Sequence, residues 1–391
     1  MPMDLELYLH IPFCIKKCNY CDFLSMPAEE EIRRHYINML LREIRKSAEV
    51  CREYRIISVF LGGGTPSMLE GRQTTELIKA VKQNFDLSPE AEITIECNPG
   101  TLTRQKLSDY WDVGINRLSI GLQSAIDSEL KLLGRIHTFE QFLENFKFAR
   151  EIGFQNINVD LIFGIPGQTK ENWSHTLQKV LGLGPEHISA YSLIIEEGTP
   201  FYERYGEDEI RREQGKSPKH LPEEETERDM YQMTGQILKD KGYQRYEISN
   251  YARPGLECRH NTGYWQGTPY LGLGLGSASL MKHKRFSNST VLEEYLKGNF
   301  QNLGQILNTN TAPCLSRKQQ MEEFMFLGLR MMEGVSKEVF RRRFGQQLEE
   351  IYGQALQKLK GQGLVEQKNE RVCLTEEGIA LSNYVLCEFL L

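Results

Sequence analysis

Short apolar runs alternate with longer amphipathic stretches over the first two hundred residues of the chain. The short runs are rich in Ile, Leu and Val, as buried strands are, and the longer stretches repeat apolar residues at helical spacing. The six expected strands are residues 5–11, 55–61, 92–97, 117–123, 157–164 and 187–194. The expected helices between them are residues 29–50, 71–85, 104–111, 139–152 and 171–181.

This rhythm of strand and helix indicates a fold class. Strands that alternate with helices usually pair in parallel, each connected to the next by a helical crossover. No dinucleotide-binding glycine fingerprint follows the first strand, so the pattern does not favour a nucleotide-binding open sheet. We therefore expect an α/β fold with a partial (β/α)6 barrel over residues 1–245.

Each expected strand sorts its residues onto two faces, because side chains alternate along a strand. In the first strand, leucines share one face and Tyr8 and His10 share the other. In later strands, Glu96, Gln123 and Asp160 lie opposite apolar faces. Polar residues towards the C-terminal ends of parallel strands build the active sites of barrels. We therefore expect these three side chains to share a cavity instead of each satisfying a separate loop.

The pattern changes beyond residue 200. Residues 203–227 are highly charged and contain Gly and Pro, which predicts a mobile surface insertion before a helix over residues 224–241. Residues 250–279 are rich in Gly and aromatic side chains and show no periodicity, which predicts structured loop. This loop belongs to an expected extension over residues 246–310.

The end of the chain predicts a smaller, mostly helical domain over residues 311–391. Helices are expected at 317–332, from Ser336 to Arg343, at 347–360 and after Thr375, with a hairpin of two short strands, LVEQ and RVCL, after Gly363. This order is typical of a winged-helix-like module. Its basic run, 341–343, lies in an acidic chain, so we expect a solvated helix face and no nucleic-acid partner.

Composition narrows the class of protein. The 391 residues are 40% hydrophobic and 26% charged, with a net charge of -6. These values exclude the disordered and collagen-like classes. No run is apolar enough to span a bilayer, and the first residues lack the basic start and cleavage site of a secretory signal. We expect a cytoplasmic protein, whose thiols stay reduced.

Three of the nine cysteines crowd into the octet CIKKCNYC, directly after the first strand. The spacing of Cys14, Cys18 and Cys21 lets three thiolates converge on one object. Three thiolates leave one iron of a four-iron cluster open for another ligand. A structural zinc site is the alternative, although it needs a fourth ligand and none is nearby. We expect most of the other cysteines to be small buried residues, and these are Cys51, Cys97, Cys258, Cys314, Cys373 and Cys387.

The second strand is followed by LGGGTPS. Three glycines allow the backbone to approach a ligand closely, and Pro66 fixes the turn. The motif lacks the lysine of a phosphate-binding P-loop. By itself, it suits a tight turn as well as a binding loop.

These motifs together resemble the radical S-adenosylmethionine superfamily, whose cluster and cofactor motifs are CxxxCxxC and GGGTP. The order of YLHIPFCIKKCNYCDF, LGGGTPS, IECNPG, RLSIGLQS, NVDLIFGIPGQT and CRHNTGYW resembles its oxygen-independent coproporphyrinogen III dehydrogenase branch over nearly the whole chain. Within that branch, Asp22 and Phe23 after the third cysteine, the short segment before the first strand and the HNxxYW pattern at 260–265 resemble the HemW-like group of heme chaperones. The dehydrogenases look longer at the N-terminus and carry Gly-Cys after that cysteine.

The resemblance implies roles for named residues. Cys14, Cys18 and Cys21 would ligate a [4Fe-4S] cluster, whose fourth iron would take the amino and carboxylate groups of S-adenosylmethionine. The implied contacts to S-adenosylmethionine are Tyr8, Tyr20, Gly63, Gly64, Thr65, Glu96, Gln123, Arg135, Asp160 and Ile194. Carboxylates and amides suit the cationic and hydroxyl groups of this ligand, and a cation suits its carboxylate. Arg135 equally suits an exposed ion pair in a loop.

The resemblance to heme chaperones also makes heme the expected cargo. His260 is the candidate axial ligand, because imidazole binds heme iron, and Cys258 is the rival ligand as a thiolate. The alternative for His260 is hydrogen bonding to loop carbonyls. His10 is expected to orient the cysteine loop. Trp265 and Tyr270 suit either the wall of a porphyrin slot or the core.

Two activities of different classes follow from the resemblance. The first is a heme chaperone that passes heme to an acceptor protein such as a respiratory cytochrome, which can be membrane-associated. The second is a radical enzyme that decarboxylates the propionates of coproporphyrinogen III. The sequence favours the chaperone, without the dehydrogenase activity, and both a monomer and a dimer fit it.

Overall fold

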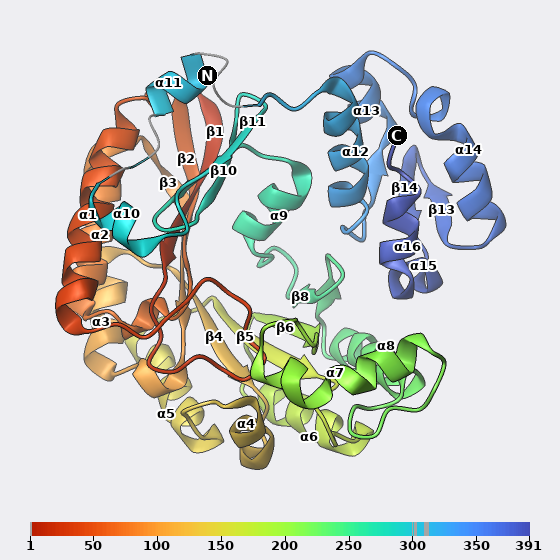
Figure 1. Cartoon of the computed structure of the whole chain (residues 1–391), viewed down its shortest axis with the longest axis horizontal. Helices are drawn as coiled ribbons and strands as arrows, with labels where there is room; N and C mark the ends of the chain where they lie inside the picture. Colours follow the sequence, from red (N-terminus) through yellow and green to blue (C-terminus); the bar gives the residue numbers. More distant parts are fainter. Residues whose placement is uncertain (1, 299, 301–302, 309–312) are drawn as a thin grey trace.

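The computed structural model describes residues 2–298, 300, 303–308 and 313–391. A curved sheet of eleven strands, in the order β11-β10-β9-β1-β2-β3-β4-β5-β6-β8-β7, forms most of the molecule (Figure 1). Strands β1 to β6 pair in parallel and in chain order. Helices cover the convex side of this curve, so the expected partial (β/α)6 barrel is confirmed.

The helices and strands alternate through the barrel. The six parallel strands are β1 (Met3–Ile11), β2 (Tyr54–Gly63), β3 (Leu87–Cys97), β4 (Arg117–Gln123), β5 (Ile157–Phe163) and β6 (His187–Ser192). The helices among and after them are α1 (Glu30–Ala48), α2 (Gly71–Asn84), α3 (Arg104–Val113), α4 (Asp127–Leu133), α5 (Phe139–Ile152), α6 (Lys170–Leu181), α7 (Pro200–Glu213) and α8 (Glu224–Asp240), with short 3-10 helices η1 (Pro66–Met68) and η2 (Pro99–Thr101). None of the helices in the described part of the chain is long and apolar enough to cross a membrane.

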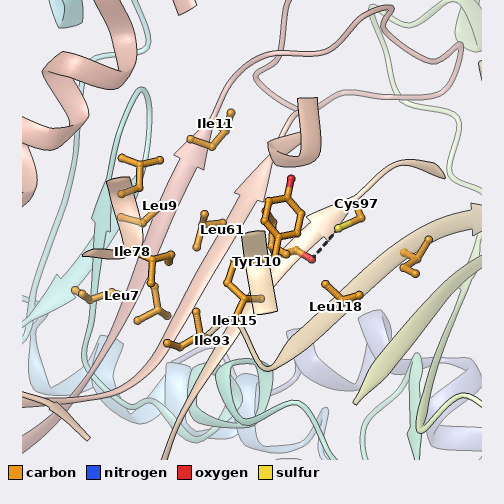
Figure 2. Packing of buried hydrophobic residues seen from close by; sticks show 14 of the residues in the cluster. Leu7, Leu9, Ile11, Leu61, Ile78, Ile93, Cys97, Tyr110, Ile115 and Leu118 are labelled. Atoms are coloured by element: carbon orange, nitrogen blue, oxygen red, sulfur yellow. Dashed lines mark hydrogen bonds between the residues drawn. The ribbon is translucent and has the colours of Figure 1, made fainter. Parts of the chain in front are cut away.

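The apolar face of the sheet packs under the outer helices. Figure 2 shows Leu7, Leu9 and Ile11 of β1 beside Leu61 of β2 and Ile78 of α2, all of them buried. Burying one such side chain stabilises the fold by about 1.5–3 kcal/mol. A slip of one residue would turn this whole face outward, so burial fixes the register of the strands. The polar residues of the same strands must then face the concave side.

Short strands extend both edges of the sheet. At one edge, β9 (Tyr270–Leu273) pairs in parallel with β1, and β10 (Ala278–Met281) and β11 (Lys284–Ser287) continue antiparallel. At the other edge, β8 (Asn250–Ala252) and β7 (Gln244–Arg245) add antiparallel strands to β6. The extension also holds α9 (Arg259–Gln266), α10 (Leu292–Leu296) and α11 (Leu303–Asn308).

The prediction of loop over residues 250–279 is therefore wrong. This stretch contains β8, α9, β9 and the start of β10. The elements are short and interrupted by glycines, so no apolar period is visible in the sequence. Gly272 illustrates the cause, because a Cβ there would lie 2.3 Å from the backbone oxygen of Ala278.

The segment over residues 203–227, for which the sequence predicts a mobile surface insertion, is helical in its first half, which α7 occupies, and the helix expected after it is α8. Thr199 caps α7 by accepting a hydrogen bond from the backbone N–H of Tyr202. The loop that follows is tied to the helix, because the carboxylate of Asp208 accepts the backbone N–H groups of residues 219–221 at 2.7–3.1 Å. The charged composition of the segment reflects these exposed helical and capping positions.

The C-terminal part builds its own core on the other side of α9 (Figure 1). It contains α12 (Arg317–Gly328), α13 (Lys337–Phe344), α14 (Leu348–Gly361), α15 (Glu376–Ala380) and α16 (Ser382–Cys387), with a small sheet in the order β12 (Val335–Ser336), β14 (Arg371–Leu374), β13 (Val365–Lys368). The side chains of Ser336 and Thr375 cap α13 and α15, as the sequence predicts. Helix α12 ends at Gly328, earlier than predicted, because the next residues turn into β12.

Candidate metal centre and cofactor site

The concave face of the sheet carries polar side chains in rows, because neighbouring parallel strands are in register. The row farthest from the carboxyl ends consists of Glu6, Ser58 and Glu92. The next row consists of Tyr8, Phe60, Thr94 and Arg117. A third row, closer to the carboxyl ends, consists of Glu96, Ser119, Asn158 and His187. Strand pairing thus aligns residues from six segments far apart in the sequence.

The cysteine loop follows β1 at the carboxyl end of the sheet. Its two ends are joined by backbone hydrogen bonds, from Met26 N to Pro12 O at 2.8 Å and from Cys14 N to Met26 O at 3.1 Å. Its middle is anchored to α4, because Asn19 donates from its backbone to Leu133 O and from its side chain to Leu132 O. The loop is therefore held on both sides by hydrogen bonds within the protein.

The three cysteines of this loop are free thiols, Cys14 buried and Cys18 and Cys21 half-buried. Among the described residues, no three Cys, His, Asp or Glu side chains lie close enough to hold one metal ion. Cysteine thiolates are the ligands that iron–sulfur clusters take from proteins, so three thiols on one loop are a donor set that suits such a cluster. Burial raises the pKa of the Cys14 and Cys21 thiols, so metal binding must release protons.

Most of the remaining cysteines are buried, as the sequence predicts. Cys51, Cys97, Cys258 and Cys373 are buried, whereas Cys314 and Cys387 are exposed. Dispersed buried cysteines behave as small apolar residues.

The glycine motif packs its backbone directly against the cysteine loop. Gly64 N donates to Ile11 O at 2.8 Å, and Thr65 N donates to Phe13 O at 2.7 Å. A Cβ on Gly64 would lie 2.6 Å from Phe13 O, closer than real Cβ atoms come. Gly63 has a φ of +113°, and its N–H donates to Glu96 Oε2 at 3.0 Å. Both positions therefore require glycine.

Two carboxylates face the interior beside this motif. Burial and the nearby charge of Asp160 raise the pKa of Glu96 to about 8. Asp160 accepts hydrogen bonds from Ser119 Oγ at 3.1 Å and from Asn158 Nδ2 at 2.7 Å. A bound cation would favour the ionised form of Glu96, which suits a sulfonium or ammonium group.

We expect Glu96→Gln to change how stability depends on pH. Between pH 4.5 and 8, the folded wild type keeps on Glu96 a proton that the unfolded chain loses, so wild-type stability falls as pH rises. Glutamine cannot titrate, so the melting temperature of the variant, relative to that of the wild type, should rise between pH 4.5 and 8 and stay constant above pH 8. Thermal unfolding at a series of pH values measures the gain, with exposed Glu144→Gln as the control. A difference independent of pH would contradict the raised pKa.

Arg135 and Gln123 meet beside the second cysteine. The guanidinium of Arg135 donates to Cys18 Sγ at 3.5 Å and to Gly121 O at 2.6 Å. Gln123 has a φ of +75°, and a Cβ on Gly121 would lie 2.9 Å from its Nε2. Arg135 makes no ion pair with any described carboxylate, so the alternative of an exposed ion pair is not what the structure contains.

The other expected cofactor residues take different positions. His10 donates from Nε2 to Leu24 O at 2.9 Å and accepts from the Tyr8 hydroxyl at Nδ1, 3.0 Å away. His10 thus holds the cysteine loop, as expected. Tyr20 lies in the same loop, half-buried against Phe201. Ile194 follows β6 and is 65% exposed.

Helix α9 lies in the hollow of the curved sheet, facing β2 (Figure 1). Its His260 ring stacks on Phe60, with centroids 5.1 Å apart, and its Nδ1 lies 2.8 Å from Ser58 Oγ. Within the described residues, the ring therefore bonds a strand hydroxyl and no loop carbonyl. Its Nε2 has no hydrogen-bond partner among the described residues. Burial and the nearby charge of Arg117 lower the pKa of His260 to about 3, which keeps the imidazole neutral.

The start of α9 is tied to β3 by one carboxylate. Glu92 accepts the backbone N–H groups of Arg259 at 3.1 Å and His260 at 3.3 Å. Cys258 is fully buried, and its thiol donates to Glu92 Oε1 at 3.4 Å. Burial raises the pKa of Cys258, which disfavours the thiolate that heme ligation would need.

At the other end of α9, the aromatic residues contact protein groups. Arg330 lies over the ring of Trp265, 4.4 Å from its centroid, and Tyr270 packs on Tyr264 at 5.1 Å. Trp265 also borders a cleft of about 360 Å³ between α9, β10 and the C-terminal domain.

Sequence reasoning missed four residues of the concave face, Glu6, Ser58, Glu92 and Arg117. The period of two that placed Tyr8 and Glu96 on this face also places these four there. The sequence does not predict that α9 packs against these residues. Arg117 is 2% exposed, and its Nε has no hydrogen-bond partner in the described part of the chain.

The half-barrel, the cysteine loop and the adjoining glycine motif define a radical S-adenosylmethionine protein. The sequence profile of the Radical SAM superfamily matches residues 8–180, and that of the HemN C-terminal domain matches residues 315–381. The solved structure of coproporphyrinogen III oxidase (HemN) from Escherichia coli shares the fold, with a TM-score of 0.82 at 25% identity over 100% of this chain and 90% of that one.

Full-length relatives narrow this class. The heme chaperone HemW of Lactococcus lactis is 36% identical over 98% of this chain and 97% of its own length. The heme chaperone HemW of Bacillus subtilis is 35% identical over 98% of both chains. The chain belongs to the HemW family.

Proposed function

We propose that this protein is a heme chaperone that binds heme at His260 and transfers it to an acceptor protein such as a respiratory cytochrome. The observation that carries the proposal is the state of the His260 ring. Its Nδ1 is engaged by Ser58, it is stacked on Phe60, and its Nε2 is unbonded within the described structure. A neutral, oriented imidazole with one free nitrogen is a suitable axial ligand for heme iron.

We also propose that Cys14, Cys18 and Cys21 ligate a [4Fe-4S] cluster with S-adenosylmethionine beside it. Such a cluster supplies one-electron reducing chemistry when bound. The proposed contacts to S-adenosylmethionine are Tyr8, Tyr20, Gly63, Gly64, Thr65, Glu96, Gln123, Arg135, Asp160 and Ile194. Gly63 and Gly64 let the glycine motif pack directly against His10 and the cysteine loop. Glu96 and Asp160 suit the cationic end of the ligand, and Arg135 suits its carboxylate.

The second candidate function is oxidation of coproporphyrinogen III. The fold that the chain shares with HemN favours it. Two observations weigh against it: the full-length relatives are named heme chaperones, and Asp22 and Phe23 follow the third cysteine. Anaerobic incubation with S-adenosylmethionine and a reductant should leave coproporphyrinogen III unconsumed.

The proposed setting is the cytoplasm, where a reducing environment keeps the three thiols available for metal. The proposed partners are heme and the acceptor protein, which can be membrane-associated. No nucleic-acid partner is proposed, since the net charge is -6.

The test is an anaerobic hemin titration of reconstituted protein, followed by visible absorption. We expect saturable one-to-one binding to the wild type. His260→Ala should weaken binding about 10-fold or more and change the Soret band, because the axial ligand is lost. Exposed His175→Ala on α6 should behave as the wild type.

Two outcomes count against the proposal. Binding by the variant with an unchanged spectrum would move the ligand away from His260, and the cleft beside Trp265 would be examined next. The absence of saturable binding by the wild type would overturn the chaperone assignment, and the coproporphyrinogen assay would become decisive.

A further inference from the structure

A chain of two hydrogen bonds runs from the barrel wall to the His260 ring. Ser58 Oγ lies 3.2 Å from Glu6 Oε1 and 2.8 Å from His260 Nδ1. Glu6 and Ser58 are register partners on β1 and β2, and both are fully buried. The three side chains therefore contact one another directly, from Glu6 to Ser58 to His260.

The direction of these bonds determines the tautomer of His260. A hydroxyl has a single proton, and Ser58 donates it to Glu6 Oε1. Burial raises the pKa of Glu6 to about 9, so its carboxyl group holds a proton of its own, which this direction places on Oε2, the oxygen without a hydrogen-bond partner in the described structure. The Ser58 oxygen can then only accept from the imidazole, so Nδ1 of His260 carries the ring proton. In a neutral imidazole with Nδ1 protonated, Nε2 holds a free electron pair.

Two further features hold the ring in this orientation. Glu92 fixes the backbone N–H of His260, and Phe60 stacks on the ring at an interplanar angle of 24°. Gly263, one helical turn further on, lets α9 lie directly on Glu6. A Cβ at position 263 would fall 2.2 Å from Glu6 Oε1.

We propose that Glu6 and Ser58 are positioning residues, which fix His260 as the Nδ1–H tautomer and so present Nε2 to the iron of heme. The choice of heme as the ligand rests on the proposed function, whereas the tautomer does not. A histidine that binds metal commonly donates its other N–H to an acceptor, which orients the ring and raises its basicity. Here the acceptor is a serine backed by a buried carboxyl group. The ligand class is an iron porphyrin with an open axial position.

The experiment measures the tautomer first and heme second. Two-bond 1H–15N spectra of the heme-free, cluster-reconstituted protein labelled with 15N-histidine distinguish the two tautomers, and the signal of His260 is identified by its loss in His260→Ala. We expect Nδ1–H in the wild type and in Ser58→Thr, which keeps the hydroxyl. Ser58→Ala should shift the signal towards Nε2–H and weaken heme binding about 10-fold or more. Ser189→Ala, which removes another inner hydroxyl of the sheet, should change neither readout.

Each outcome has a distinct meaning. A wild-type Nε2–H tautomer would reverse both hydrogen bonds and overturn the inference, as would an unchanged tautomer in Ser58→Ala. If the Nδ1–H tautomer depends on Ser58 but the protein fails to bind heme, the positioning role is supported and the proposed function is contradicted. If Ser58→Ala loses heme binding and Ser58→Thr loses it as well, the hydroxyl group is not what supports heme binding, which contradicts its positioning role.

Discussion

Replacing Cys14, Cys18 and Cys21 together by Ala is expected to abolish incorporation of the iron-sulfur cluster. The loop that carries them is anchored by backbone bonds and by Asn19, so it should remain in place without the thiols. The remaining cysteines lie outside this loop and are dispersed along the chain, so they offer no substitute set of three neighbouring thiolates among the described residues. Iron content and visible absorption after anaerobic reconstitution measure the loss.

The matched control is Cys51→Ala, which removes a buried thiol outside this loop and should leave the iron content unchanged. A triple variant that keeps the wild-type iron content would show that the cluster, if present, is held elsewhere. Retention of a single zinc ion by the wild type after metal exchange would instead favour the alternative metal.

Gly64→Ala is expected to have the next largest effect, although it adds only one methyl group. The new Cβ would lie 2.6 Å from the backbone oxygen of Phe13, which cannot rotate away as a side chain could. Relief requires the cysteine loop to move, and overpacking of this kind costs about 1–3 kcal/mol of unfolding free energy. We expect lower stability, incomplete cluster incorporation and weaker binding of S-adenosylmethionine. Denaturant unfolding, iron content and calorimetric titration measure the three effects.

Gly353→Ala in α14 is the matched control, because nothing lies within 4 Å of its added Cβ. In a helix interior, this change should raise stability by about 0.5–1 kcal/mol. If Gly64→Ala were equally harmless, the close contact between the glycine motif and the cysteine loop would have no energetic importance.

The parallel part of the fold was predictable because each of its strands buries a complete apolar face. Leu5, Leu7 and Leu9 alternate with polar residues, and the helices between strands carry regular apolar stripes. Strand β9 gave no such signal. Its four residues include Gly272, and its place beside β1 depends on a pairing between distant segments that no local period encodes.

Some residues of the candidate site could likewise be predicted from the sequence and others could not. Glu96 and Asp160 could be placed at one end of the barrel, because parallel strands bring their carboxyl ends together. Ser58 could not be singled out, because a serine on the inner face of a strand is ordinary until another element contacts it. That element, α9, has Gly263 as its one buried residue, so its sequence carries no apolar stripe that predicts where it packs.

The pairing of β1 with β9 has a consequence for synthesis on the ribosome. One edge of β1 pairs with β2, which follows closely in the chain. The other edge pairs with Tyr270–Leu273, and the ribosome makes this segment only after more than half of the chain has been translated. An exposed strand edge invites pairing with other chains. At roughly 5–20 residues per second, this edge stays open for tens of seconds. The nascent protein is therefore most prone to aggregation in that interval, and a ribosome-bound chaperone would protect it most there.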